Sequence, residues 1–103
     1  MIKGIGVDIV EFKRIQLKIA KKILSVKELL IYDTLTDNLK KEFLAERFAV
    51  KEALFKADNK YFDYDKVSVL NDESGKPYLD GINGMVSIAH DGGMVVAFVV
   101  LIN

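Results

Sequence analysis

Three ionisable residues, Asp8, Glu52 and Lys56, stand in apolar surroundings and have side chains suited to chemistry. Glu52 and Lys56 belong to a stretch from Lys40 to Ala57 that lacks glycine and proline, which predicts a helix of four or more turns. Their spacing puts both on one side of that helix, between apolar neighbours. They form either a surface ion pair worth about 0.3–0.5 kcal/mol or charged groups beside a cleft, matched there by a metal, an anion or each other.

Asp8 belongs to a predicted strand from Ile2 to Val10, in which side chains alternate between two faces. One face carries isoleucine and valine, and the other consists of Gly4, Gly6 and Asp8. A face made of two glycines and one carboxylate allows another element to approach closely, with Asp8 as its functional group. The alternative is an edge strand in which Asp8 caps the following helix.

The composition predicts one domain spanning residues 1–103 with a modest core. Half of the residues are hydrophobic and only one is proline, so some apolar surface is expected to be covered by another subunit. Fifteen basic residues balance fifteen acidic ones, which gives no indication of nucleic acid or of an anionic membrane as a partner. Without a signal-peptide core or a membrane-spanning run, we expect a cytoplasmic protein.

Metal chemistry is restricted by the residue types available. The chain has no cysteine and one histidine, His90, so a conventional zinc site is excluded and ligation of a hard cation by carboxylates remains. His90 stands at a predicted strand end beside a glycine turn, where a single histidine is more often structural than catalytic. No phosphate-binding loop, nucleophile elbow or dinucleotide fingerprint occurs.

Helices are expected before and within the central region. The stretch from Glu11 to Lys22 has a helical pattern with isoleucines inward and a basic outer face. A second short helix is predicted from a capping box at Ser25 through Tyr32, and Thr36 or Asp37 is expected to cap the long central helix. The basic face is either simply solvated or able to attract an acidic partner; it consists of Arg14, Lys18, Lys21 and Lys22.

Strands are expected to dominate after Ala57. A loop over residues 58–66 leads to a strand over 67–70, a turn over 71–77 and a short strand near 78–79. Residues 85–90 and 94–102 predict a hairpin around Asp91-Gly92-Gly93. The last strand is apolar on both faces, so it should lie inside a sheet covered on both sides. The predicted fold is α+β, with a small antiparallel sheet packed on the long central helix.

Four motifs together resemble the holo-acyl-carrier-protein synthase family of 4′-phosphopantetheinyl transferases. They are GIGVDIVE over residues 4–11, RFAVKEALFKA over 47–57, GKP over 75–77 and VSIAH over 86–90. The resemblance implies transfer of phosphopantetheine from coenzyme A to a serine of acyl carrier protein, with release of 3′,5′-ADP. It also implies a homotrimer whose active sites are shared between neighbouring subunits.

The resemblance also implies roles for individual residues. Asp8 and Glu52 would bind Mg²⁺, Glu52 would help to remove the serine proton, and Lys56 would stabilise the leaving phosphate. Because acyl carrier proteins are acidic, the basic face formed by Arg14, Lys18, Lys21 and Lys22 is expected to dock the carrier. The positions implied for coenzyme A are Arg47, Gly75, Lys76, Pro77 and His90.

Two departures from the family pattern concern coenzyme A. No glycine occurs in the loop directly after Ala57, where the family commonly has a glycine-rich one, and Ala89 stands where a hydroxyl residue is usual. They leave an alternative function: a non-catalytic oligomeric binding protein of the same fold that has lost coenzyme A. Retention of Asp8, Glu52 and Lys56 favours the enzyme.

Overall fold

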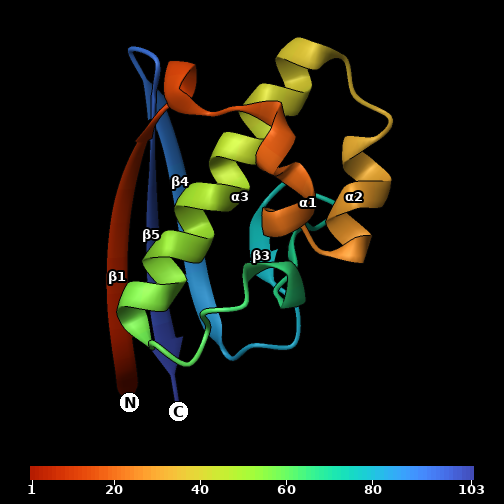
Figure 1. Ribbon diagram of the computed structural model, residues 1–103. Coiled ribbons are helices and arrows are strands. Elements are labelled where there is room, and N and C mark those ends of the chain that lie inside the picture. Colours follow the sequence, from red (N-terminus) through yellow and green to blue (C-terminus); the bar gives the residue numbers. More distant parts are fainter.

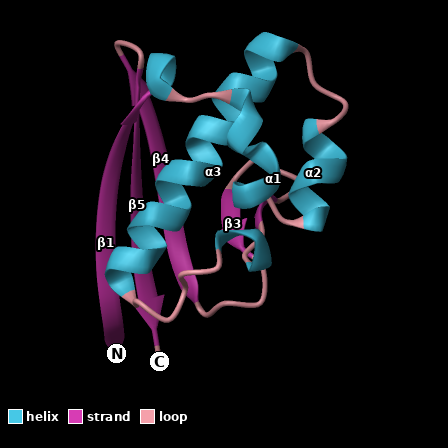
Figure 2. Cartoon of the chain, viewed as in Figure 1, coloured by secondary structure: helices cyan, strands magenta, loops and turns pink.

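The computed structural model describes all residues, Met1–Asn103. Strands β1 (Ile2–Glu11), β5 (Met94–Ile102) and β4 (Gly84–Asp91) form an antiparallel sheet in the order β1-β5-β4. A separate hairpin pairs β2 (Val69–Asn71) with β3 (Pro77–Leu79). Helix α3 (Asp37–Ala57) lies along one face of the larger sheet, and α1 (Ala20–Ile23) and α2 (Val26–Tyr32) lie on the far side of α3 (Figures 1 and 2). The predicted α+β class is confirmed, although the strands form two sheets.

Helix α3 packs against the glycine face of β1 at backbone distance. A Cβ atom on Gly4 would lie 2.2 Å from the carbonyl oxygen of Ala57, and one on Gly6 would lie 1.8 Å from that of Ala53. Any side chain at these two positions would therefore force the helix away from the strand. The glycines fix the distance between β1 and α3, and the functional side chains of both elements lie beside this contact.

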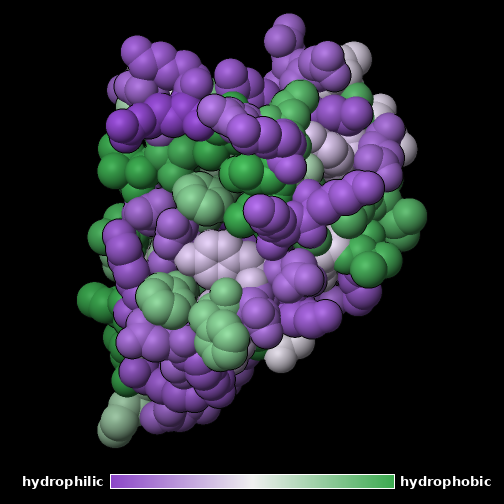
Figure 3. Space-filling model, in the orientation of Figure 1, coloured by the Kyte–Doolittle hydropathy of each residue, from purple (hydrophilic) through white to green (hydrophobic).

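The central strand β5 has two apolar faces, as its sequence predicts. Its inward residues, Val95, Ala97, Val99 and Leu101, are buried beneath α3. On the other face, Phe98 pairs across the strands with Val7, and both side chains are exposed. Figure 3 shows apolar residues along the left margin, where Figure 1 has the sheet. The outward face adds Ile5, Ile9 and Met85 to this exposed apolar surface.

The helix predicted over Glu11–Lys22 is wrong. Strand β1 continues to Glu11, two 3₁₀ helices follow at Phe12–Arg14 and Leu17–Ile19, and only Ala20–Ile23 is α-helical (α1). Ile15 is extended and buried at the point where the two 3₁₀ helices are separated. Burial of Ile15 against the core thus overrides the helical pattern, although the prediction that the isoleucines face inward is correct.

Helix α2 (Val26–Tyr32) begins at the predicted capping box. The side chain of Ser25 accepts a hydrogen bond from the Glu28 backbone, and Glu28 accepts one from the Ser25 backbone. Helix α3 begins at Asp37 with Thr36 at its N-cap position, as predicted, although the Thr36 side chain makes no capping hydrogen bond. No helix combines the length and the apolar character needed to cross a bilayer.

A fully buried ion pair between Lys51 and Glu28 connects α3 to the surrounding elements. Lys51 Nζ donates to Glu28 Oε1 at 2.5 Å and to the carbonyl oxygens of Ile23 and Tyr64 at 2.7 and 2.9 Å. Glu28 Oε2 accepts from the Val69 amide at 2.8 Å. Burial lowers the pKa of Lys51, and the Glu28 carboxylate opposes that effect. One pair of side chains thereby joins α1, α2, α3, the Tyr64 segment and β2.

Replacement of Lys51 by Met should destabilise the protein by about 3–5 kcal/mol, because Glu28 would keep a buried charge without a partner. The free energy of unfolding in urea measures the loss. The double variant Lys51→Met/Glu28→Gln should be less destabilised than Lys51→Met alone, since it removes that charge. Lys27→Ala, which breaks an exposed ion pair with Asp80, is the control and should cause no comparable loss. A double variant as unstable as the single one would contradict this account.

Candidate active site

Asp8 and Glu52 line the same cavity, as the resemblance implies. The cavity has a volume of about 370 Å³ and lies between the second half of β1, the segment after it and α3. Asp8 comes from the inward face of β1, opposite Ala97 in the register, and Glu52 comes from the middle of α3. The other lining residues are Ile9, Val10, Glu11, Arg14, Ile15, Ile19 and Phe48.

Lys56 forms an ion pair with Asp8, and not with Glu52. Its Nζ donates to Asp8 Oδ1 at 3.1 Å and to the carbonyl oxygen of Val7 at 3.0 Å. The i,i+4 pair between Glu52 and Lys56 is therefore absent, and so is the alternative in which Asp8 caps the next helix. The long lysine side chain reaches from α3 to the strand, where it is half exposed. Asp8, Lys56 and Glu52 are brought to the same junction of α3 and β1.

Glu52 has a partner that the sequence reasoning missed. The hydroxyl of Tyr64 donates to Glu52 Oε2 at 2.7 Å, and the Tyr64 ring lies edge-on to Phe48. Burial and the Glu52 carboxylate both raise the pKa of Tyr64, so its hydroxyl stays protonated and acts as a donor. The backbone carbonyl of Tyr64 is the one that Lys51 binds. The buried ion pair thus fixes the residue that orients Glu52.

The two carboxylates fit a hard divalent cation. Asp8 Oδ1 is used by Lys56 and Glu52 Oε2 by Tyr64, whereas Asp8 Oδ2 and Glu52 Oε1 have no hydrogen-bond partner in the protein. Two free carboxylate oxygens on the wall of one cavity, with no nitrogen or sulfur ligand, are the donor type that Mg²⁺ prefers.

Arg47 is buried, which the sequence did not predict. Its guanidinium donates to the Val69 carbonyl oxygen at 3.2 Å and to Asn71 Oδ1 at 2.6 Å, and it lies 3.9 Å from the Phe43 ring centroid. Burial lowers its pKa. Arg47 therefore fastens the β2–β3 hairpin to α3, so its replacement by alanine would disturb the hairpin as well as any ligand contact.

The turn between β2 and β3 has a conformation that depends on Asp72 and Gly75. Asp72 Oδ1 accepts hydrogen bonds from the Ser74 hydroxyl and from the backbone amides of Lys76 and Ser74, and these lower the pKa of Asp72. Gly75 has φ of 87°, in the left-handed region that favours glycine. Lys76 is exposed and forms no ion pair, and Pro77 begins β3. The turn presents Lys76 to solvent beside the hairpin that Arg47 holds.

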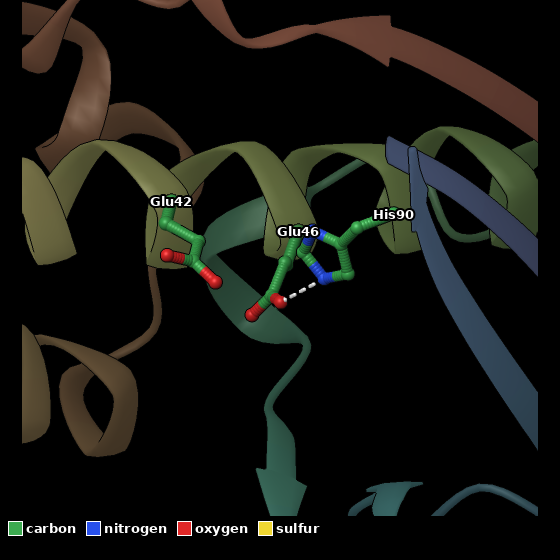
Figure 4. Close-up of side chains that lie close together, drawn as sticks. All are labelled: Glu42, Glu46 and His90. Carbon is green, nitrogen blue, oxygen red and sulfur yellow. Dashed lines mark ion pairs between the residues drawn. The ribbon is translucent and has the colours of Figure 1, made fainter. Parts of the chain in front are cut away.

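His90 lies near the end of β4 and contacts α3. Its Nε2 is 2.5 Å from Glu46 Oε2, and its ring stacks on Phe12 with centroids 5.7 Å apart. Figure 4 shows Glu46 and His90 joined by this contact, with Glu42 one turn earlier on α3. Because Glu46 also contacts Arg47 at 3.1 Å, it connects two of the residues implied for coenzyme A, Arg47 and His90. Glu46 was missed by the sequence reasoning.

The predicted basic surface is exposed, although its backbone is not one helix. Its four residues are Arg14, Lys18, Lys21 and Lys22, and they extend over the two 3₁₀ helices and α1. None forms an ion pair within 4 Å, so their charges are uncompensated by protein carboxylates at that distance. Arg14 also lines the cavity of Asp8 and Glu52, which places one end of the basic surface at the candidate site.

Comparison with known proteins identifies the family. A family model for the 4′-phosphopantetheinyl transferase superfamily matches residues 4–99. The chain belongs to this superfamily. A holo-[acyl-carrier-protein] synthase from Petrotoga mobilis is 47% identical and aligns with 100% of this chain and 98% of its own length. One from Mycoplasma mobile is 38% identical, with 96% and 89% covered.

Solved structures of the phosphopantetheinyl transferase superfamily share the fold. A holo-(acyl-carrier-protein) synthase from Bacillus anthracis, in complex with CoA (3′,5′-ADP), has a TM-score of 0.88 at 38% identity, covering 98% of this chain and 96% of that one. The synthase from Neisseria meningitidis has a TM-score of 0.81 at 28% identity, with both chains covered completely. The family expected from the four motifs is confirmed.

Proposed function

We propose that this protein is a holo-[acyl-carrier-protein] synthase, which transfers the 4′-phosphopantetheine group of coenzyme A to a serine of acyl carrier protein and releases 3′,5′-ADP. The single observation that carries the proposal is the meeting of Asp8, Glu52 and Lys56 at one junction of β1 and α3, in a chain of this family. Relatives named for this activity align over almost the whole chain.

In the reaction, the serine oxygen forms a bond to the phosphorus that carries pantetheine, and the bond from that phosphorus to 3′,5′-ADP breaks. The serine proton must leave, and negative charge develops on the departing phosphate. We propose that Asp8 Oδ2 and Glu52 Oε1 hold Mg²⁺, because these oxygens are free of protein partners. Bound there, Mg²⁺ would neutralise pyrophosphate oxygens.

Glu52 is also the proposed acceptor of the serine proton, directly or through water. Tyr64 holds one oxygen of its carboxylate, which fixes the orientation of the other. Lys56 is proposed to stabilise the leaving phosphate. Its half-exposed side chain, tied only to Asp8 and the Val7 carbonyl, has room to turn toward an incoming phosphate.

For the nucleotide part of coenzyme A, we propose a surface formed by Arg47, Gly75, Lys76, Pro77 and His90. Lys76 is the freest cation of the set, since it is exposed and unpaired. The His90 side chain is about one third exposed, whereas Arg47 is 3% exposed and also holds the hairpin through its hydrogen bonds to Val69 and Asn71. For the acidic carrier protein, the proposed docking surface is the basic one that ends at Arg14 beside the cavity.

We propose that the protein assembles as a homotrimer through the outward face of the β1-β5-β4 sheet. That face exposes apolar side chains from three strands, including the cross-strand pair Val7 and Phe98. When a sheet is apolar on both faces and its own helix covers one of them, the other face is typically covered by a second subunit. Subunit packing there would lie beside Lys56, which lines a cavity with Val7 and Phe98.

The function is tested by incubating apo acyl carrier protein with the enzyme, coenzyme A and Mg²⁺ and measuring the intact mass of the carrier. Glu52→Gln should reduce transfer roughly 100-fold or more while the far-UV circular dichroism stays unchanged, because the substitution removes a charge and a base with little change in shape. Asp8→Asn should lose activity that high Mg²⁺ partly restores. Turnover near the wild-type rate for Glu52→Gln at saturating Mg²⁺ would exclude its assignment.

The docking surface is tested by reversing Lys18 and Lys21 to Glu, which leaves Arg14 in the cavity untouched. The KM for carrier protein should rise at low salt, and the Kd for coenzyme A should change little, because exposed charges steer the acidic partner. The effect should shrink at high salt, since screening acts over roughly 8–10 Å. The control is Lys60→Glu/Lys66→Glu on another exposed segment. If both double variants raised the KM for carrier protein equally, net charge and not this surface would be the cause.

The trimer is tested with Phe98→Glu, which introduces a charge into the apolar sheet face. Sedimentation velocity should show a trimer for the wild type and monomers for the variant, because an unpaired charge is costly to bury in an interface. Leu30→Glu is the control, since Leu30 is an exposed apolar residue on α2, outside the sheet. A wild-type monomer, or dissociation by Leu30→Glu alone, would contradict the proposed interface.

A further inference from the structure

Glu46 lies between the Arg47 guanidinium and the His90 ring. Its Oε1 accepts from Arg47 NH1 at 3.1 Å, and its Oε2 lies 2.5 Å from His90 Nε2. The carboxylate is 19% exposed, while the Arg47 side chain is 3% exposed and the His90 side chain 35%. Figure 4 shows Glu46 and His90 pointing toward each other from α3 and β4. One carboxylate therefore contacts both side chains from the protein side.

The Arg47 and His90 side chains have little freedom to turn toward another partner. Arg47 is fixed by hydrogen bonds to Val69 and Asn71, and only the NH1 contact with Glu46 leads toward His90. The His90 ring is held against Phe12. Glu46 itself makes no hydrogen bond other than those to Arg47 and His90, and its side chain is on a helix surface that is partly open. Of the three groups, Glu46 is the one that can rotate away.

An anion that approaches Arg47 and His90 meets the Glu46 carboxylate in the same place. Two negative charges a few ångströms apart repel each other most where the surroundings exclude water. Burial already raises the pKa of Glu46, despite the opposing effect of Arg47 and His90. A phosphate group can therefore contact Arg47 and His90 only if the Glu46 carboxylate turns away from them.

We propose that Glu46 sets the affinity for coenzyme A by competing with the phosphates of its nucleotide end for Arg47 and His90. This inference rests on the proposed function, which gives those two residues to coenzyme A. Glu46 is thus an affinity-determining residue that is displaced when the nucleotide binds. In the free protein, Glu46 keeps the Arg47 and His90 side chains oriented and occupies the place that a phosphate would take.

A metal site at the same place is less well supported. Glu42, Glu46 and His90 each have a ligand atom within 4.8 Å of the others. However, the Arg47 guanidinium lies against Glu46 and supplies the positive charge that a metal would bring. Glu42 is exposed and contacts neither Arg47 nor His90. No feature beyond this cluster points to a cation, and we assign none.

The test is the Kd for coenzyme A and for 3′,5′-ADP, measured by titration calorimetry on the whole protein without carrier. Glu46→Gln keeps the shape of the side chain and removes its charge, so both ligands should bind about tenfold more tightly. In the transfer assay, the KM for coenzyme A should fall and kcat should stay near the wild-type value. Glu46→Ala, which suits a helix, should behave alike and serves if the glutamine variant does not fold.

The matched control is Asp37→Asn, which removes a charge from an exposed position at the start of α3 that has no ion pair with Arg47 or His90. Its Kd values should stay within about twofold of wild type if contact, and not net charge, is the cause. Unchanged or weaker binding by Glu46→Gln, in a protein whose wild type transfers phosphopantetheine, would overturn the inference alone. A wild type that neither binds coenzyme A nor modifies the carrier would overturn the proposed function and the inference together.

Discussion

The close contact between the glycine face of β1 and the backbone of α3 is the constraint on which the rest of the structure depends. Gly4 and Gly6 leave room only for the helix itself, so the helix axis has one allowed distance from the strand. At that distance Lys56 reaches Asp8, and Glu52 lines the same cavity as Asp8. A larger residue at either glycine would separate Asp8 from Glu52 and Lys56, although the glycines themselves carry no functional group.

Helix α3 contributes to every part of the site because its circumference is divided among different tasks. One side packs on the sheet, and another carries Glu52 and Lys56 toward β1. On the side of α3 away from the sheet, Arg47 fastens β2 to the helix. Lys51 does the same for α1, α2 and the Tyr64 segment. A helix with so many buried contacts offers a rigid base for catalytic side chains, as preorganised sites require.

The sequence predicted the elements and faces that depend on local pattern. Strand alternation placed Asp8 on the glycine face, and helical spacing placed Glu52 and Lys56 together. It did not identify the partners, because Tyr64, Glu28 and Glu46 meet their contacts only through the tertiary fold. One signal was present but unused: at 100° per residue, Lys51 falls between the two apolar arcs of α3, where a lysine has no access to water. The broken helix after Glu11 follows likewise from the burial of Ile15, which no local pattern reveals.

The pairing of β1 with β5 has a consequence for the order of events during synthesis. β1 is made first among the strands and β5 last, yet β5 is the central strand of the sheet and β1 is hydrogen-bonded to it along one edge. While the chain emerges from the ribosome, β1 has exposed hydrogen-bonding groups and an apolar flank, a state that invites aggregation or chaperone binding. Such distant pairings also slow folding, because a long loop must close before they form. A nascent chain would therefore contain Asp8 and Glu52 well before it could hold them together, because β1 gains its strand partner only when the final strand has been made.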